Sequence, residues 1–363
     1  MRNLKMQIEK RLKELQEYYL EHSIDEKFPK VIKEQLGIEI NAFYGKFKIS
    51  HPVLVAPGQL TREKQQIERI KNSGYAGCVL KSVVGEDEKG NCSMIRYRKS
   101  MTFLKTVYED FDKEGAFPVI LWNGRADVRN LKNYFEFAKE VFSMNNNNFL
   151  IVSSVLSHFP EKNQEIKKDE WIYTTKKLYE IGYRFFEIDF CPGLKIEKEI
   201  TEKENILRIY REIPQILKDA FPEIVVFPKL INLDYGIDFQ VKMVEEAIKG
   251  RADGIVIGNR IFKEEINGAW GGKELRERNL KVIKEVKKSY PKFSISGTGG
   301  IYTGEHIYQY LKSGADSVQI LSYILGKVKK PFLKQKGDKF EKVIYELFFN
   351  PVDGLLKCYL AIT

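Results

Sequence analysis

Eight short apolar runs alternate with longer charged segments of helical period, and this alternation restricts the fold more than any other feature of the 363-residue chain. Strands that are apolar along their whole length are buried on both faces, and strands separated by helices form parallel sheets. Eight such units match a (β/α)8 TIM barrel, an α/β fold of about 250 residues. A doubly wound open sheet is the alternative. The predicted strands lie at 52–57, 77–82, 149–155, 184–190, 224–230, 253–259, 293–299 and 316–321, and the predicted helices at 61–73, 128–142, 170–181, 203–219, 236–248, 273–289 and 304–313.

The rest of the chain lies before, within and after this barrel. Apolar residues at spacings of three and four predict a helix over 1–36, packed on the barrel or on a neighbouring subunit. Docking of this helix on a membrane surface is the alternative, which its glutamates disfavour. A surplus apolar run at 118–122 is assigned to a long loop inserted at 83–147. We therefore predict an N-terminal helical extension at 1–44, the barrel at 45–330, and a C-terminal helix and tail packing on the barrel at 331–363.

Composition excludes several classes of protein. The 60 lysine and arginine residues exceed the 50 aspartate and glutamate residues, giving a net charge of +10, but the two signs alternate along the chain, so no nucleic-acid partner is indicated. Four widely spaced cysteines exclude a disulfide scaffold and favour a reducing cytoplasm. The N-terminus lacks an apolar signal segment, and no apolar run is long enough to span a membrane. Four scattered histidines predict no metal site.

Lysines follow two of the predicted strands. In a barrel, the carboxyl ends of all strands open onto one face, where ligands bind. Lys81 and Lys229 each end an apolar run, so both ammonium groups are expected in one pocket. An unpaired buried charge is costly, and such a pair therefore requires an anionic or electron-rich ligand. A salt bridge to a local carboxylate is the alternative for either lysine alone.

A glycine-rich turn at 297–300 is the sharpest motif. Glycines let backbone N–H groups approach an anion, and a helix that begins after Thr303 adds positive potential. The turn belongs to the seventh strand–helix unit, and Leu321 and Ser322 follow the eighth strand, which is where many barrels bind phosphate. The motif therefore predicts a phosphate site, and a purely structural turn is the alternative.

Cys191 directly follows the strand at 184–190, two residues after Asp189. A thiol in a cleft can act as a base or nucleophile when its pKa falls from about 8.5 toward neutrality, and a small buried residue is the alternative. Asn259 follows another strand and can hydrogen-bond the edge of a planar ring. The next residue, Arg260, is interpreted as surface charge.

Taken in order and spacing, these motifs resemble the dihydroorotate dehydrogenase family of FMN-dependent barrels over about residues 45–325. The motifs are HPVLVAPGQL, GCVLKSVVGED, VSSV, EIDFCPG, PKL, ADGIVIGN, NGAWGGKELRERNLKVI, SGTGGIYTGEHI and GADSVQIL. The resemblance implies that Cys191 is the base while hydride passes to flavin N5, with Lys81 near flavin and substrate. Lys229 would stabilise negative charge on the reduced ring. The implied FMN contacts are Ala56, Gly58, Lys81, Ser82, Lys229, Gly271, Gly272, Gly299, Gly300, Leu321 and Ser322, and the implied substrate contacts are Asn123, Asp189 and Asn259.

The substrate end departs from the family pattern. The family has N-x-S-C-P-N around its base, whereas this chain ends the motif in Gly193 and has Ile188 or Asp189 in place of the first asparagine. Those asparagines hydrogen-bond the pyrimidine and its carboxylate in the family, so a dihydroorotate carboxylate would lose its partners here. Asn123 is the candidate substrate-side asparagine, and Arg125 is a candidate replacement partner for an anion.

These features predict a cytoplasmic, FMN-dependent oxidoreductase of pyrimidine biosynthesis that oxidises dihydroorotate or a related dihydropyrimidine. Cysteine as the base is typical of the soluble class of the family, while the N-terminal extension resembles the membrane-linked class, so the electron acceptor is open. The family precedent implies a homodimer. Two alternatives are a flavin-free, phosphate-binding lyase or isomerase and a catalytically altered homologue that serves as a binding protein.

Overall fold

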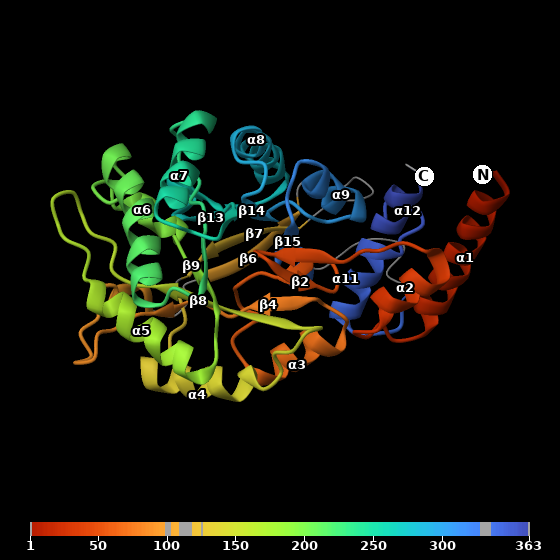
Figure 1. Cartoon of the computed structure of the whole chain (residues 1–363), viewed down its shortest axis with the longest axis horizontal. Helices are drawn as coiled ribbons and strands as arrows, with labels where there is room; N and C mark the ends of the chain where they lie inside the picture. Colours follow the sequence, from red (N-terminus) through yellow and green to blue (C-terminus); the bar gives the residue numbers. More distant parts are fainter. Residues whose placement is uncertain (1, 99–102, 109–117, 125, 327–334, 362–363) are drawn as a thin grey trace.

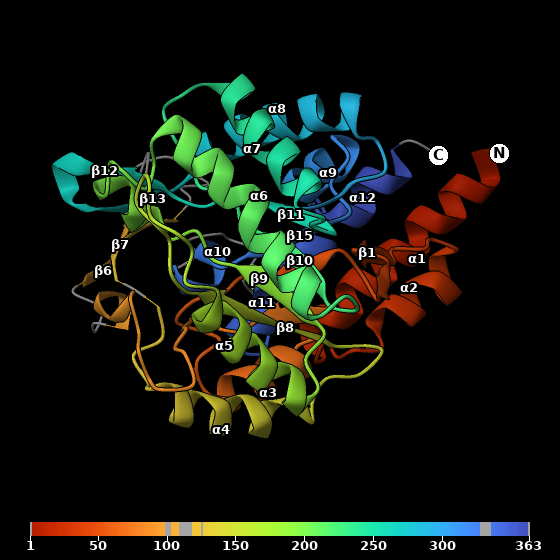
Figure 2. The same cartoon turned by 60° about the vertical axis from the view of Figure 1, so that its left-hand side comes forward.

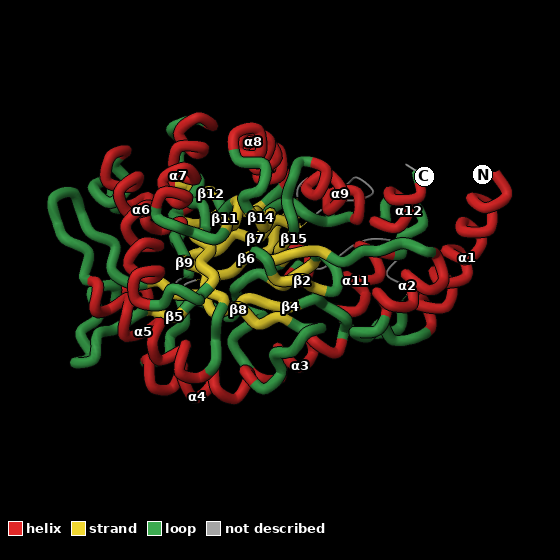
Figure 3. Tube along the Cα trace, in the orientation of Figure 1, coloured by secondary structure: helices red, strands yellow, loops and turns green. Residues whose placement is uncertain are grey.

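Eight parallel strands form the centre of the molecule (Figure 3). The computed structural model describes residues 2–98, 103–108, 118–124, 126–326 and 335–361. The strands follow the order β10-β9-β8-β4-β3-β15-β14-β11, with the short β5 (Val83–Val84) pairing beside β8. Their bounds are β3 Val53–Val55, β4 Gly77–Val79, β8 Leu150–Leu156, β9 Phe185–Ile188, β10 Val225–Pro228, β11 Gly254–Ile257, β14 Ser294–Thr298 and β15 Ser317–Ile320.

The sheet closes on itself between β10 and β11. Lys229 forms a parallel bridge with Val256, the backbone N–H of Leu230 donates to the carbonyl of Val256 over 2.8 Å, and that of Asn259 donates to the carbonyl of Leu230 over 2.7 Å. A sheet closed in this way is a (β/α)8 barrel, so the predicted fold class is confirmed and the open-sheet alternative is excluded.

The helices from α3 to α9 connect successive strands and surround the barrel (Figure 1). Each buries an apolar stripe against the sheet, as the helical period of the sequence predicts. Local capping sets some of their starts, for example at Asn130, whose side chain accepts a hydrogen bond from the backbone N–H of Asn133 over 2.9 Å. Their bounds are α3 Lys64–Asn72, α4 Leu131–Phe142, α5 Lys168–Ile181, α6 Lys203–Ala220, α7 Ile237–Lys249, α8 Lys273–Ser289 and α9 Gly304–Lys312.

A hairpin closes the amino-terminal end of the barrel. Strands β1 (Ala42–Tyr44) and β2 (Phe47–Ile49) pair antiparallel, and their buried residues join a small apolar cluster with inward-facing residues of the barrel strands. The ring of Tyr44 stacks on that of Phe227 with a centroid distance of 4.3 Å. This floor leaves the opposite end, where the strands terminate, as the accessible end of the barrel.

The N-terminal segment forms two helices rather than the single helix predicted over 1–36. Helix α1 spans Arg2–Glu21 and α2 spans Phe28–Leu36, with Pro29 in the first turn of α2, where proline is tolerated. Both lie beside the C-terminal helices α11 (Lys339–Phe348) and α12 (Leu355–Leu360) (Figure 1). The hydroxyl of Tyr345 donates to the carbonyl of Gln16 over 3.2 Å. The two ends of the chain therefore pack together on one side of the barrel.

A second, antiparallel sheet lies beside the barrel (Figure 2). The sequence places the run at 118–122 in an inserted loop, but the run forms strand β7, paired with β6 from the same insertion and with β13, in the order β12-β13-β7-β6. The pairing joins two segments about 150 residues apart, which local periodicity cannot reveal. The bounds are β6 Phe103–Tyr108, β7 Pro118–Asn123, β12 Ile261–Lys263 and β13 Gly268–Gly271, with short 3-10 helices η1 Ile95–Arg98, η2 Pro192–Ile196 and η3 Glu264–Ile266.

The described residues contain neither a membrane-spanning helix nor a cluster of metal ligands. Along these residues, no helix combines the length and apolar character needed to cross a bilayer. Nor do histidine, cysteine and acidic side chains of the described ranges gather in a group that could hold a metal ion.

Candidate functional site

A pocket with an empty volume of about 800 Å³ opens at the carboxyl ends of the barrel strands. Its walls come from loops after seven of the eight strands and from β7 and β13 of the second sheet. The pocket thus brings together segments that lie as far apart in the sequence as Ala56 and Ser322. The predicted site residues that line it are Ala56, Lys81, Ser82, Asp189, Cys191, Lys229, Asn259, Gly271, Gly299, Gly300, Leu321 and Ser322.

Two predicted glycines lie behind the wall rather than in it. A Cβ added to Gly58 would lie 2.4 Å from Cδ2 of Leu321, so Gly58 allows Leu321 to reach the pocket. The carbonyl oxygen of Gly272 would lie 2.9 Å from a Cβ added to Gly300, so Gly272 supports the glycine turn from outside. Gly58 and Gly272 therefore shape the pocket only indirectly, through the lining residues Leu321 and Gly300.

Asn123, the predicted substrate-side asparagine, also lies outside the main pocket. Its amide nitrogen donates to the carbonyl of Asn267 over 2.6 Å. It lines a smaller cavity of about 230 Å³, which shares Trp122 and Cys191 with the main pocket and also contacts Gly193. Trp122 therefore borders both the main pocket and the cavity at Gly193, one of the positions at which the family pattern is lost. Arg125 is outside the described residues.

At one end of the pocket, the backbone forms a glycine cradle, which we define as Gly299 and Gly300. Their φ angles of +100° and +63° lie in the left-handed region that favours glycine. A Cβ on Gly300 would also lie 2.9 Å from Cβ of Arg276, so no larger residue fits. The cradle faces a wall that includes Ser322, the first residue of the short helix α10 (Ser322–Leu325). Backbone packed this closely can approach an anion without interference from side chains.

The start of α9 does not face this pocket, although the sequence predicts that it adds potential at the phosphate. Thr303 does cap the helix, because its hydroxyl accepts from the backbone N–H of His306 over 3.1 Å. The N–H of Glu305 donates to the carbonyl of Asp353 over 2.9 Å. The first turn of α9 is thus directed at the C-terminal segment, and α10 takes the predicted place of α9 at the cradle.

Two buried lysines line the same pocket. Lys81 and Lys229 are only 5% and 6% exposed, and within the described residues neither ammonium group forms an ion pair. The Nζ atom of Lys81 lies 4.4 Å from the centroid of the Trp122 ring, a cation–π contact. Burial lowers the pKa of Lys81 to about 8, although the charges of Asp189 and Cys191 oppose this shift. Neither lysine forms the alternative salt bridge, so both charges are available to a ligand.

Beneath the pocket lies a polar group inside the barrel. Glu187 on β9 is fully buried and accepts hydrogen bonds from the hydroxyl of Tyr44, over 2.8 Å, and from the amide of Gln319. Burial raises the pKa of Glu187, while the charge of Lys229 lowers it. The Oε1 atom of Gln319, which lines the pocket, is buried without a hydrogen-bond partner. Burial of an acceptor without a hydrogen bond lowers the stability of the fold, and a hydrogen-bond donor on a bound ligand would remove this penalty.

Cys191 lies at the other end of the pocket, directly before η2, and is 5% exposed. Asp189 beside it accepts from the hydroxyl of Ser82 over 2.7 Å and from the amide of Asn259 over 3.4 Å. The same amide donates to the carbonyl of Phe190 over 2.9 Å. The polar side chains around the thiol therefore hold one another in place, which positions Cys191 at the boundary of the two cavities.

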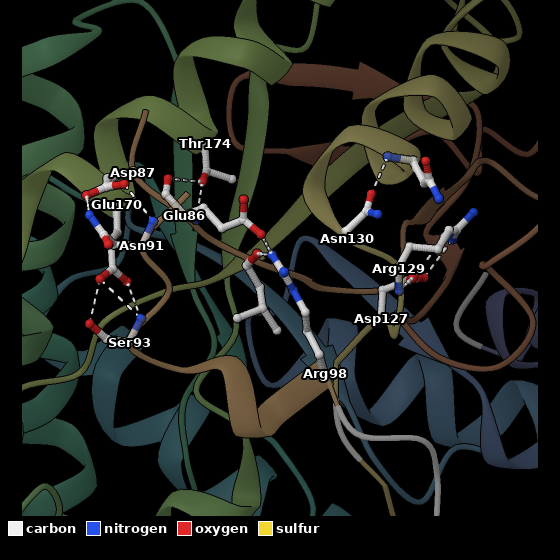
Figure 4. Close-up of polar contacts among 12 residues, drawn as sticks. Glu86, Asp87, Asn91, Ser93, Arg98, Asp127, Arg129, Asn130, Glu170 and Thr174 are labelled. Carbon is white, nitrogen blue, oxygen red and sulfur yellow. Dashed lines mark hydrogen bonds and ion pairs between the residues drawn. The ribbon is translucent and has the colours of Figure 1, made fainter. Parts of the chain in front are cut away.

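Two ion pairs within the inserted segment, one on each side of β7, hold this segment together (Figure 4). Before β7, Arg98 is paired with Glu86. After it, Asp127 is paired with Arg129, whose Nε lies 2.8 Å from Oδ1, and the backbone N–H of Asp127 donates to the carbonyl of Ser82 over 2.7 Å. These contacts bring β7 and its Trp122 over the pocket.

Among the wall residues that were not assigned to the site from the sequence, two stand out, Trp122 and Arg260. Arg260, interpreted above as surface charge, lines the pocket with its Cζ atom 5.0 Å from the centroid of the Trp122 ring. Its Nη1 atom is buried and has no hydrogen-bond partner, and burial lowers its pKa to about 10. The only sequence signal was its place directly after a strand, beside Asn259. Trp122 could not be found because its pairing with β13 is a long-range contact.

These features place the protein among the (β/α)8 barrels that carry their ligand site at the carboxyl ends of the strands. No protein-family model matches the chain. Among curated proteins, the chain is 24% identical to the catalytic subunit of dihydroorotate dehydrogenase B (NAD(+)) from Pyrococcus abyssi over 78% of this chain and 86% of that protein. It is 26% identical to the same subunit from Thermotoga maritima, over 42% of this chain and 58% of that protein, which is less than two thirds of the relative's length. It is 28% identical to a dihydroorotate dehydrogenase (quinone) from Sulfurimonas denitrificans over 42% of this chain.

The chain is therefore similar to dihydroorotate dehydrogenases at 24–28% identity. The resemblance seen in the ordered motifs is confirmed. Relatives of both kinds, named for NAD(+) and for quinone, match at similar identity, so the comparisons do not separate the two electron acceptors.

Proposed function

We propose that this protein is an FMN-dependent oxidoreductase that removes two hydrogen atoms from the ring of dihydroorotate or of a related dihydropyrimidine. The observation that carries the proposal is the union, in one pocket, of a glycine cradle, two buried lysines and a buried cysteine. The similarity to dihydroorotate dehydrogenases supports this combination as an FMN and substrate site.

Three features of the pocket fit FMN. The glycine cradle has no space for a Cβ and would hold the phosphate together with Ser322. The unpartnered Oε1 of Gln319 suits an N–H donor of the flavin ring. The unpaired ammonium group of Lys229 suits the ring edge at which negative charge accumulates. FMN bound there would supply an acceptor for a hydride.

Cys191 would take the proton that leaves the substrate carbon next to the one that loses the hydride. Its thiol lies near the positive charges of Lys81 and Arg260, and neighbouring cations favour the ionised form of a thiol. Asp189 and Asn259 would orient the ring, because each is already held by protein partners. The small exposed fraction of Cys191 keeps water away from the proton transfer.

The test is spectroscopic. Purified protein mixed with FMN should retain a yellow chromophore after gel filtration, and dihydroorotate or dihydrouracil should bleach it without oxygen and support turnover with a dye acceptor. Such a dye replaces both NAD(+) and quinone, so the result does not depend on the natural acceptor. A protein that stays colourless would contradict the proposal and favour a flavin-free, phosphate-binding barrel. Light scattering on the same sample tests the homodimer, which we also propose from the family precedent.

A further inference from the structure

The charges of the main pocket do not balance. Lys81, Lys229 and Arg260 line it, and Asp189 is the only acidic residue among its lining residues. Both carboxylate oxygens of Asp189 already accept hydrogen bonds, one from Ser82 and the other from Asn259. Even with the buried Glu187, whose carboxyl group interacts with the charge of Lys229, the described residues at the pocket supply two carboxyl groups to three cationic side chains.

Arg260 is the most unusual of these cations. Two other arginines near the pocket, Arg98 and Arg129, each pair with a carboxylate (Figure 4). No acidic side chain of the described ranges forms an ion pair with Arg260, and its Nη1 atom is buried without a hydrogen bond. The guanidinium remains protonated at neutral pH, so the pocket holds a fixed charge that no carboxylate of the described residues pairs with.

The structure also holds Arg260 in position. The side-chain oxygen of Asn259 accepts a hydrogen bond from the backbone N–H of Arg260 over 2.9 Å, and the guanidinium lies over the Trp122 ring. The Trp122 ring contacts the ammonium group of Lys81 as well as the guanidinium of Arg260, with centroid distances of 4.4 Å and 5.0 Å. Trp122 also lines the smaller cavity together with Cys191. Arg260 is thus grouped with Lys81 and Trp122, in the part of the wall that adjoins the cavity of Cys191.

We infer that Arg260 determines substrate specificity by binding a carboxylate on the substrate ring, in place of the asparagine hydrogen bonds that the family makes and that Gly193 cannot make. This inference rests on the proposed function. A guanidinium presents two parallel N–H groups that match the two oxygens of a carboxylate. The chain would thus select carboxylated rings over uncharged rings of the same shape.

The experiment compares matched ligands on the FMN-loaded protein. Orotate is titrated against uracil, which is the same ring without the carboxylate, and nicotinate against nicotinamide. Binding is followed by the change in flavin absorbance and, independently, by quenching of tryptophan fluorescence. The wild-type protein should bind each acid more tightly than its uncharged partner. Arg260→Gln should weaken acid binding by about ten- to hundred-fold and leave the uncharged ligands unchanged. Arg260→Lys should retain part of the preference, because it keeps the charge without the planar fork.

Controls separate the inference from the proposed function. Arg211→Gln removes an exposed arginine on α6 that pairs with Glu246, and it should leave both affinities unchanged. Retention of the acid preference by Arg260→Gln, or absence of any preference in the wild-type protein, overturns the inference while FMN binding and turnover stand. A wild-type protein that binds no FMN contradicts the proposed function, and fluorescence titration of that flavin-free protein still reports on Arg260. Far-UV circular dichroism verifies that each variant is folded.

Discussion

The two ends of the pocket are built in different ways. At the cradle, Gly299 and Gly300 present backbone groups, and their conformation follows from a local turn between β14 and α9. At the thiol end, Lys81, Trp122 and Arg260 present side chains from three separate segments. The backbone cradle does not depend on side chains from elsewhere in the chain. The thiol end depends on three side chains, so a few substitutions there can change which ligand fits. A family can therefore keep its cofactor and change its substrate.

The largest expected effect is at the thiol end. Cys191→Ala should leave FMN bound but slow its reduction by substrate by about 10²–10⁴-fold, which is the usual contribution of a general base. Anaerobic stopped-flow absorbance measures this rate. Cys358→Ala is the matched control, because that half-buried cysteine lies on α12, away from the pocket. Unchanged reduction kinetics in Cys191→Ala would remove the thiol from the mechanism.

At the cradle, Gly300→Ala should weaken FMN binding by about ten- to hundred-fold, because a displaced turn loses charge-assisted hydrogen bonds to the phosphate. Gly37→Ala is a control with nearly the same backbone strain, since its φ is +69° against +63° for Gly300, but no atom lies within 4 Å of its added Cβ. Both variants should unfold at a lower temperature. Equal FMN affinity in the two, measured by equilibrium dialysis, would mean that the turn is only structural.

The pH dependence of ligand binding distinguishes the two ends further. Lys81, with a pKa of about 8, is charged below pH 8 and neutral above it, so acid ligands should bind about ten-fold more weakly as the pH rises past 8. Lys81→Gln should lack this inflection. The free energy of unfolding of the ligand-free protein should instead rise with pH between pH 8 and about 10.4. In this range Lys81 is neutral in the folded protein but still protonated in the unfolded chain, so a higher pH favours the folded protein. Thermal melts across this range measure it, and a flat profile contradicts the shift.

The smallest effect is expected at Asn123. Its amide is already bound to the carbonyl of Asn267 outside the main pocket, so Asn123→Ala should change ligand affinity by less than about two-fold. Asn259→Ala is the contrast. Because Asn259 lines the main pocket, this substitution should lower ligand affinity more than Asn123→Ala does. An equal loss in both variants would indicate that the two cavities act as one.

Much of the fold could be predicted because it depends on local pattern. The eight strands and the helices from α3 to α9 appear close to their predicted bounds, since a buried parallel strand is apolar throughout and a covering helix is apolar on one side. The predictions failed where contacts are long-range. Strand β13 pairs with β7 across the sequence, and α1 stops at Glu21 although its apolar spacing continues.

The sequence by itself determined that strand ends, a glycine turn, two lysines and a cysteine converge on one face of a barrel, because the direction of parallel strands makes that convergence unavoidable. It could not determine which of those residues reach the pocket. Asn123 was expected there and lies outside, whereas Arg260 was expected on the surface and lies inside. Only the tertiary structure decided this, because the second sheet sets Trp122 between the two cavities and the indole defines which side chains can meet a ligand.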